Sequence, residues 1–248
     1  MQRISLYDDV VIKVSSAPGV RVKTDSAEAP DNSGNIAWRA AAALLQRAGC
    51  DAGIDISITK RIPVAAGLGG GSSNAASTLL GLNELLGLGF TAEELMATGR
   101  QLGADVPFFI FGKAAIAEGV GEKLTELSAL PQLPLVVVNP GFPVATAWVY
   151  QNLGLTIEKV AAKISLLYES AADLCGILSN DLEAVTISRF PVIREIKDQL
   201  MVAGALGSLM SGSGPSVFAV FDDAETAAVA AEQLARTRGW FTAAVSTI

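Results

Sequence analysis

Histidine is absent from this 248-residue chain, and cysteine occurs only twice. Without histidine, a Ser-His-Asp triad, a Cys-His pair and a histidine-ligated metal site are all excluded. Any general base must therefore be Asp, Glu, Lys, Tyr or Cys. The two cysteines, Cys50 and Cys175, lie far apart in the sequence and have neither metal-ligand nor disulfide spacing. We expect them to be ordinary reduced thiols.

Charge is also sparse, and positive charge especially so. Only 17% of the residues are charged, and 18 lysines and arginines stand against 25 acidic residues, which gives a net charge of −7. An acidic chain repels nucleic acid and anionic membrane surfaces, so neither is an expected partner. The longest uncharged stretch, between Arg61 and Glu84, has Gly, Ser and Asn at its centre and would make a poor membrane helix. Because the first residues carry no secretion signal, we expect a cytoplasmic monomer or homodimer.

Half of the residues are hydrophobic, and their spacing indicates interleaved helices and strands without a regular βαβ repeat. This arrangement favours an α+β fold, with helices packed on mixed or antiparallel sheets. Proline and serine in the stretch 128–134 mark the expected joint between two domains, 1–130 and 131–248. We expect strands at 10–14, 20–22, 54–58, 114–118, 135–139, 206–210, 215–221 and 240–246. We expect helices at 36–48, 73–87, 91–102, 143–153, 157–169, 191–203 and 223–237.

A glycine- and serine-rich segment lies between the strand at 54–58 and the helix expected from about residue 73. Glycines permit positive φ and close approach of a ligand, and successive backbone N–H groups can converge on an anion. The start of a helix adds partial positive charge, so the segment predicts a phosphate cradle. No Gly-Lys-Ser/Thr ends it, so it is not a Walker A loop. The alternative is a flexible turn. The candidate ligands are Pro63, Val64, Ala65, Ala66, Gly67, Leu68, Gly69, Gly70, Gly71, Ser72 and Ser73, of which the two serines could also contact a magnesium ion.

A single carboxylate, Asp105, follows the helix at 91–102 and precedes the apolar run Val106–Phe111. Burial beside such residues raises the pKa of a carboxyl group, whereas a nearby cation lowers it. A carboxylate held in place can accept the proton of an attacking hydroxyl group, as in other phosphoryl-transfer enzymes. The alternative is that Asp105 simply caps the next turn. From the spacing alone, both hypotheses stand.

Three strings resemble the motifs of the GHMP kinase superfamily. PVAAGLGGGSSNAA, which starts at Pro63, resembles its second motif, LGADVPFF around Asp105 resembles its catalytic motif, and SGSGPS at 211–216 resembles its third. The resemblance implies a two-domain kinase, with an N-terminal ATP-binding domain at 1–130 and a C-terminal domain at 131–248. It also implies that 63–73 holds the triphosphate of ATP with Mg2+, that Asp105 is the catalytic base, and that 211–216 supports the phosphate loop.

The triple glycine followed by Ser-Ser-Asn-Ala-Ala resembles one branch of the superfamily, which acts on a cytidine diphosphate derivative. The resemblance implies transfer of the γ-phosphoryl group of ATP to the 2-hydroxyl of the methylerythritol part of that small molecule, in the non-mevalonate isoprenoid route. By position, Thr146 and Tyr150 match residues near the cytidine, and the ring of Tyr150 could stack on the base. The alternative is that Tyr150 and Trp148 are core residues of a helix. Two further strings resemble family strings. For Ala117–Glu122 we expect tight backbone turns near the substrate, whereas Asn180-Asp181 has no assigned chemistry.

The chain departs from this branch in one respect. Members of the branch begin with an Ala-Lys-Ile/Leu-Asn-Leu strand, whose lysine pairs with the catalytic aspartate, and soon after have an Asp-Gly-Tyr-His segment that contributes to the cytidine site; neither occurs here. A downstream start codon, a truncation and a true loss each explain this difference. We expect an unpaired sheet edge, low solubility and weak activity in the chain as written. The alternative functions are another GHMP small-molecule kinase and a non-catalytic nucleotide-binding pseudokinase.

Overall fold

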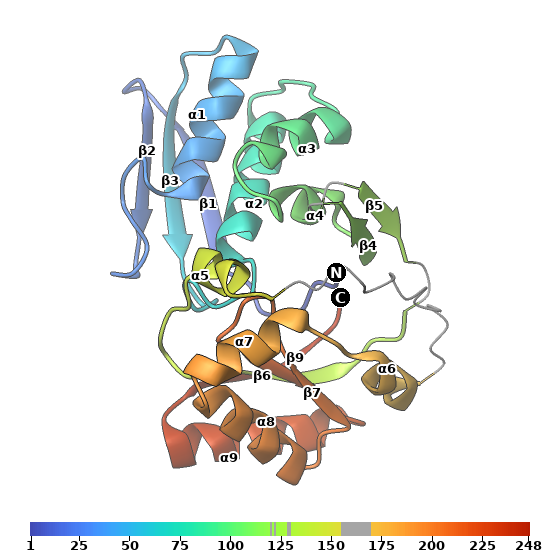
Figure 1. Cartoon of the computed structure of the whole chain (residues 1–248). Coiled ribbons are helices and arrows are strands. Elements are labelled where there is room, and N and C mark those ends of the chain that lie inside the picture. The colour runs from blue at the N-terminus through green and yellow to red at the C-terminus, as the bar shows by residue number, and fades with distance from the viewer. Residues whose placement is uncertain (120, 122, 128–129, 155–169) are drawn as a thin grey trace. The chain divides into compact units, whose positions relative to one another are not determined.

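The computed structural model describes residues 1–119, 121, 123–127, 130–154 and 170–248. The helix expected at 157–169 lies outside the described residues. The chain divides into two compact units (Figure 1). The first holds residues 1–64 and 69–130, and the second holds residues 65–68 and 131–248. Residues 65–68 of the glycine-rich segment therefore belong to the second unit, whereas the rest of the segment belongs to the first.

A three-stranded sheet in the order β1-β3-β2 forms the base of the first unit. The central strand β3 (Gly53–Thr59) runs antiparallel to β1 (Asp9–Ser15) and parallel to β2 (Val20–Thr24). Side chains alternate between the two faces of a strand, and the three isoleucines of β3 share the face that is buried in the core. The expected alternation at 54–58 is confirmed.

The helices of the first unit are α1 (Ile36–Ala48), α2 (Gly70–Leu85), α3 (Ala92–Arg100) and α4 (Val106–Phe111). α1 and α2 pack on each other and on the sheet through one apolar cluster, and α4 packs against α2 and α3. Local capping signals are confirmed, because the side chain of Asn35 accepts a hydrogen bond from the N–H of Ala37 and Gly49 ends α1 in the left-handed conformation. Thr91 and Glu94 form the expected capping box at the start of α3.

A short antiparallel pair completes the first unit, formed by β4 (Ala115–Glu118) and β5 (Lys123–Glu126). Backbone hydrogen bonds in both directions join Met1 to Ala115 at the start of β4. The sequence pattern predicted a strand near 114–118 but not its partner β5. Three of the four side chains of β5 are polar and exposed, so this strand has no apolar alternation by which to predict it.

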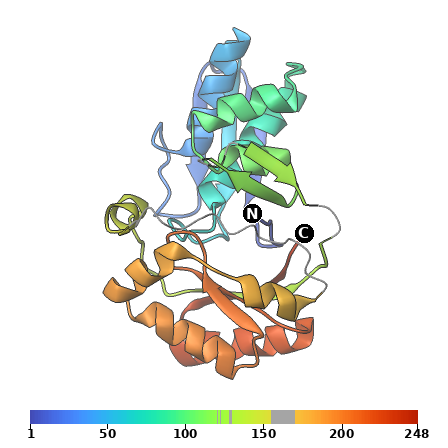
Figure 2. The same cartoon turned by 45° about the vertical axis from the view of Figure 1, so that its right-hand side comes forward.

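An antiparallel sheet of four strands in the order β7-β8-β6-β9 organises the second unit. Its strands are β6 (Pro134–Asn139), β7 (Gly207–Met210), β8 (Val217–Val220) and β9 (Phe241–Ser246). Two helices, α8 (Val192–Val202) and α9 (Ala224–Arg238), lie along one face of this sheet (Figure 2). Their apolar side chains and those of the strands form one buried core, which includes Val136, Ile196 and Leu234.

Three shorter helices complete the described part of the second unit: α5 (Thr146–Gln151), α6 (Ala171–Ile177) and α7 (Asp181–Arg189). α5 is shorter than the helix expected at 143–153, because Ala145 is extended and forms its N-cap, and the last helical residue is Gln151. The sequence pattern predicted neither α6 nor α7, and it gave no secondary structure for residues 106–111, which form α4. The helices α4, α6 and α7 are short, so each has too few turns to show apolar periodicity. The mixture of helix-covered sheets confirms the expected α+β class.

β1 lies at one edge of its sheet and leaves Val11 and Val14 exposed. Exposed apolar edge strands promote pairing between molecules. We predict that the double substitution Val11→Lys and Val14→Lys lowers light scattering of concentrated protein and changes the free energy of unfolding by less than about 1 kcal/mol. Val229→Lys in α9 is the matched control, because Val229 is also exposed but lies on a helix without an unpaired strand edge. An equal fall in light scattering in Val229→Lys would contradict the edge-strand explanation.

Candidate functional site

The glycine-rich segment adopts the backbone that a phosphate cradle requires. Ala65, Gly67 and Gly69 have φ values of 51°, 74° and 69°. Left-handed residues alternating with ordinary ones turn successive N–H groups toward the same side of the chain, which forms an anion-binding concavity. Ala65 adopts this conformation despite its Cβ, which carries a steric cost. The local backbone therefore supports the cradle predicted from the sequence, rather than an unstructured turn.

The helix that follows starts earlier than predicted. α2 begins at Gly70 and not near residue 73, because Gly69 ends the loop as a left-handed N-cap and its carbonyl accepts the first helical bond, from the N–H of Ser73 at 2.8 Å. Gly70, Gly71, Ser72 and Ser73 therefore form the first helical turn. Within the described part of the chain, no group accepts a hydrogen bond from the N–H of Gly70, Gly71 or Ser72. Such donors, with the helix dipole, suit an anionic ligand.

Glycine is required at this helix start because the neighbouring side chains leave no space. A Cβ on Gly70 would lie 2.9 Å from Cγ2 of Ile62, and a Cβ on Gly69 would lie 2.9 Å from the ring of Phe109. Both distances are too short for carbon atoms. The first turn of α2 is thus held between the segment before the loop and helix α4, all within the first unit.

Asp105 lies at the N-cap position of α4, but its side chain makes no capping hydrogen bond. The hypothesis that Asp105 only caps the next turn is therefore wrong. Gly103, two residues earlier, lies against the first turn of α2, because a Cβ on it would be 3.7 Å from Oγ of Ser72. The structure thus brings the turn that carries Asp105 up to the helix start that carries the free amides.

Neighbouring protein atoms displace water from the carboxyl group of Asp105 and raise its pKa above the usual aspartate value. Among the described residues, none forms an ion pair with this carboxylate. A carboxylate with a raised pKa binds a proton more readily than an ordinary one, which suits the task of a general base. The residue as a whole is nevertheless exposed, because the neighbouring atoms cover only part of it.

The string Ala117–Glu122 forms the end of β4 and the turn that follows, with residues 120 and 122 outside the described part. Gly119 and Gly121 have φ values of 71° and 103°, and a Cβ on Gly121 would lie 3.5 Å from the carbonyl oxygen of Ala104. This turn therefore reaches the backbone just before Asp105, within the first unit. Its contribution is a tight backbone, as the sequence indicated.

In the second unit, residues 65–68 pack against the second glycine cluster, residues 211–216. Oγ of Ser211 donates a hydrogen bond to the carbonyl of Gly67 at 2.9 Å, and the N–H of Ser216 donates to the carbonyl of Ala66 at 3.3 Å. A Cβ on Gly67 would lie only 2.3 Å from the carbonyl oxygen of Ser211. The cluster at 211–216 therefore supports the loop, as the resemblance implied.

Two residues that the sequence analysis left without a role hold this second cluster in place. The amide of Asn180 donates to the carbonyls of Met210 and Gly212, both at 2.8 Å, and its oxygen caps α7. Glu183 accepts from the N–H of Met210 at 2.8 Å and forms an ion pair with Lys197. In the sequence, only the resemblance of the Asn180-Asp181 dipeptide to a family string pointed to this region. The residues that Asn180 binds, Met210 and Gly212, lie about thirty positions further along the chain, so no local pattern predicts the contact.

The two residues predicted to lie near a cytidine belong to α5 in the second unit. Oγ1 of Thr146 lies 2.9 Å from Oγ of Ser213, which places the start of α5 against the second glycine cluster. Tyr150 is 60% exposed, so the alternative that it is a core residue is wrong. Trp148 is partly buried against Phe190, and the guanidinium of Arg189 lies 4.6 Å from its ring centre. A helix that presents an exposed tyrosine in this way can offer its ring to a ligand.

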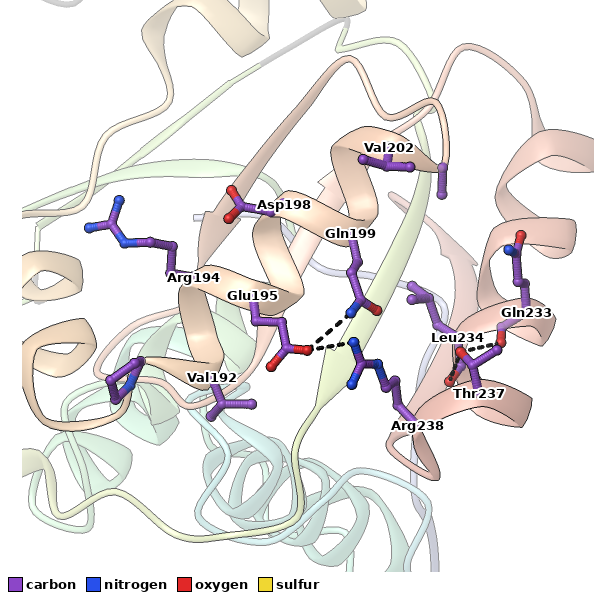
Figure 3. A pocket seen from close by; sticks show the side chains of 12 residues that line it. Val192, Arg194, Glu195, Asp198, Gln199, Val202, Gln233, Leu234, Thr237 and Arg238 are labelled. Carbon is purple, nitrogen blue, oxygen red and sulfur yellow. Dashed lines mark hydrogen bonds and ion pairs between the residues drawn. The ribbon is translucent and has the colours of Figure 1, made fainter.

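A groove of about 760 Å³ lies between α8 and α9 in the second unit (Figure 3). None of the predicted site residues lines it. Glu195 accepts a hydrogen bond from Gln199 at 3.2 Å and forms an ion pair with Arg238 at 2.6 Å inside the groove, as the dashed lines in Figure 3 show. Within the groove, Glu195 and Arg238 therefore neutralise each other.

Among the described residues, no three His, Cys, Asp or Glu side chains gather as a metal site would require. No helix within these residues is both long and apolar enough to span a bilayer.

Comparison with known proteins shows that the chain is similar to kinases. Residues 35–113 match the GHMP kinases N terminal domain, and residues 158–239 match the GHMP kinases C terminal domain. The 4-diphosphocytidyl-2-C-methyl-D-erythritol kinase of Geobacter sulfurreducens is 60% identical over 248 residues, which are 100% of this chain and 88% of that protein. The kinase of the same name from Geobacter sp. strain M21 is 57% identical over 100% of this chain and 89% of its own length.

A solved structure shows the same fold. The crystal structure of a 4-(cytidine 5'-diphospho)-2C-methyl-D-erythritol kinase superposes with a TM-score of 0.84 at 36% identity. The match covers 99% of this chain and 88% of that one.

The contact between Gly67 and the second glycine cluster leads to a test by substitution. Gly67→Ala adds backbone strain at positive φ and a clash with the carbonyl of Ser211, so we predict a loss of about 3 kcal/mol or more in the free energy of unfolding. Gly239→Ala is the matched control, since Gly239 has a φ of 66° but open space around its Cβ position; it isolates the strain, about 1 kcal/mol. Denaturation followed by the fluorescence of Trp148 and Trp240 measures both. Equal losses would contradict the clash.

Proposed function

Because the chain belongs to the GHMP kinases, and within them to the family of 4-diphosphocytidyl-2-C-methyl-D-erythritol kinases, we propose that it phosphorylates the 2-hydroxyl of 4-diphosphocytidyl-2-C-methyl-D-erythritol. As a member of this superfamily, the chain is an ATP-dependent small-molecule kinase. The identity of 60% with a relative of that name, over the whole chain, favours this substrate over mevalonate, homoserine or a sugar.

The start of α2 is the observation that carries the proposal. Three backbone N–H groups without acceptors among the described residues, at Gly70, Gly71 and Ser72, point from a helix N-terminus that follows three left-handed residues. We assign the terminal phosphates of ATP to this group of donors. Fixed dipoles of this kind stabilise the charge that develops on a transferred phosphoryl group, and they need no reorganisation during the reaction.

Asp105 is the proposed base. In this role its carboxylate accepts the proton of the 2-hydroxyl as that oxygen attacks the γ-phosphorus and the bond to the bridging oxygen of ADP breaks. The position of its turn against Ser72 and the raised pKa both support the assignment. A base whose pKa is raised takes up a proton more readily than an ordinary carboxylate.

Mg2+ is the proposed metal, because phosphoryl transfer from ATP needs a cation to screen the phosphates. The hydroxyls of Ser72 and Ser73 lie in the first turn of α2 and are hard oxygen ligands of the kind Mg2+ prefers. Magnesium usually keeps phosphate oxygens and waters as its main ligands, so a site with few protein carboxylates fits it. We also propose that Thr146 and Tyr150 bind the cytidine part of the substrate, and that the enzyme acts in the cytoplasm.

ADP release in the presence of ATP and Mg2+ tests the substrate assignment. We predict that 4-diphosphocytidyl-2-C-methyl-D-erythritol gives a kcat/KM at least about a hundredfold above that of mevalonate, homoserine or galactose, since a site that pairs with polar groups of the substrate rejects analogues that lack them. The comparison among acceptors does not depend on the absolute rate. Preference for another acceptor would reassign the substrate, and ATP binding without transfer to any of them would support a pseudokinase.

Asp105→Asn tests the base. The amide cannot accept the proton, so we predict a fall in kcat of about a hundredfold to ten-thousandfold. ATP affinity, measured by calorimetry, should stay within about threefold, because the amides of α2 are untouched. Since the folded-state pKa of Asp105 is raised, its ionised form destabilises the fold at pH 7, and Tm should rise or stay constant in the variant. Near-normal turnover in Asp105→Asn would overturn the assignment.

The raised pKa also predicts a pH dependence. The base is active only when ionised, so kcat/KM should fall as pH drops through the pKa of Asp105, and this acid limb should lie above the ordinary aspartate value of about 3.9. The Tm advantage of Asp105→Asn should shrink over the same range, because protonation removes the charge in the parent protein. A profile of kcat/KM and Tm from about pH 8 to about pH 4 measures both. A rate that stays constant down to about pH 4 would exclude Asp105 as the base.

A further inference from the structure

Another aspartate of the first unit, Asp8, has a buried side chain. Its side chain is 1% exposed, and that of its partner Lys60 is 9% exposed. Burial of a charged group is unfavourable unless its hydrogen-bonding capacity is met. A buried ion pair by itself adds little net stability, so we infer that Asp8 and Lys60 serve to fix the geometry of the backbone around them.

The carboxylate of Asp8 gathers donors from three successive residues. Oδ1 accepts the backbone N–H of Arg61 at 2.7 Å and that of Ile62 at 2.8 Å, while Oδ2 forms the ion pair with Nζ of Lys60. Hydrogen bonds to a charged acceptor are stronger and shorter than those between neutral groups. Asp8 thus fixes the backbone path of 60–62, which ends immediately before Pro63 and the phosphate loop.

Ile62 transmits this position to the start of α2. Ile62 is buried, and its Cγ2 would lie only 2.9 Å from a Cβ atom placed on Gly70. Any shift of Ile62 therefore either opens a gap beside Gly70 or pushes on it. Asp8, Lys60, Ile62 and Gly70 all belong to the first unit, so the whole path lies within one compact body.

We propose that Asp8 is a positioning residue for the kinase reaction: together with Lys60 it holds 60–62 so that the free amides at the start of α2 keep the geometry needed for ATP. The inference rests on the proposed function, because it concerns the same phosphate site. Asp8 acts through backbone groups and a buried isoleucine and does not itself contact the substrate.

The neighbouring pair provides an internal comparison. Asp9 pairs with Arg61 at 2.6 Å, but both side chains are about half exposed, at 47% and 48%. Exposed ion pairs contribute little to structure or stability. Asp9 and Asp8 are adjacent and chemically identical, so a substitution at Asp9 changes the net charge equally without touching the backbone N–H groups of 61 and 62.

The experiment compares Asp8→Ala, Asp8→Asn and the control Asp9→Ala in the full chain. We measure the Kd for ATP with Mg2+ by calorimetry, and the KM values for ATP and for the cytidine-containing acceptor. For Asp8→Ala we expect Kd and KM for ATP to rise about tenfold to a hundredfold, since small displacements of positioning groups have effects of that size. The KM for the acceptor should not change. Asp8→Asn keeps an oxygen for both backbone N–H groups and should recover a substantial part of the loss, whereas Asp9→Ala should match the parent.

Hydrogen exchange of the backbone amides supplies a readout that is independent of activity. In Asp8→Ala, exchange should accelerate in residues 60–73 and stay unchanged in the strands of the second unit. A general loss of stability would instead lower the active fraction and leave both KM values unaltered, which would overturn the proposal. If the parent binds ATP and Asp8→Ala binds it equally well, this inference fails alone. If the parent does not bind ATP, the proposed function fails and the inference falls with it.

Discussion

The amides at the start of α2, which have no acceptor among the described residues, are the constraint on which the rest of the structure depends. A helix end leaves its first N–H groups without partners, and a ligand anion is the natural acceptor. To keep those groups accessible, the chain must approach the helix through left-handed residues and must omit side chains at Gly69 and Gly70. The glycines serve two purposes at once, since they permit the backbone angles and leave space for Ile62 and Phe109.

Each compact unit holds its own part of the loop by polar contacts. In the first unit, the ion pair of Asp8 and Lys60 stands next to the residues that enter the loop. In the second, Ser211 and Ser216 bind the carbonyls of Gly67 and Ala66, and the side chain of Asn180 holds the cluster to which they belong. Polar networks that are fully satisfied specify one arrangement of the backbone. A phosphoryl-transfer site needs this rigidity more than it needs reactive side chains, because its catalysis is mainly positioning.

Much of the local structure could be predicted from the sequence because it depends on near neighbours. The capping box at Thr91, the stop at Gly49 and the alternating isoleucines of β3 each involve residues within a few positions of one another. The resemblance to GHMP kinases is confirmed by relatives that match the whole chain. Short elements such as β5 and α7 escaped prediction, because a few residues carry too little periodicity.

The sequence by itself determined the family, the α+β class and the position of the glycine-rich segment that we propose binds phosphate, since motif spacing and hydrophobic periodicity are properties of the chain. Only the tertiary structure decided that α2 begins at Gly70, that Asp105 makes no capping bond, and that Tyr150 is exposed. It alone revealed the network of Asp8, whose partners lie more than fifty positions away. The physical reason is that burial and hydrogen-bond partners are set by segments distant in sequence, which no local pattern records.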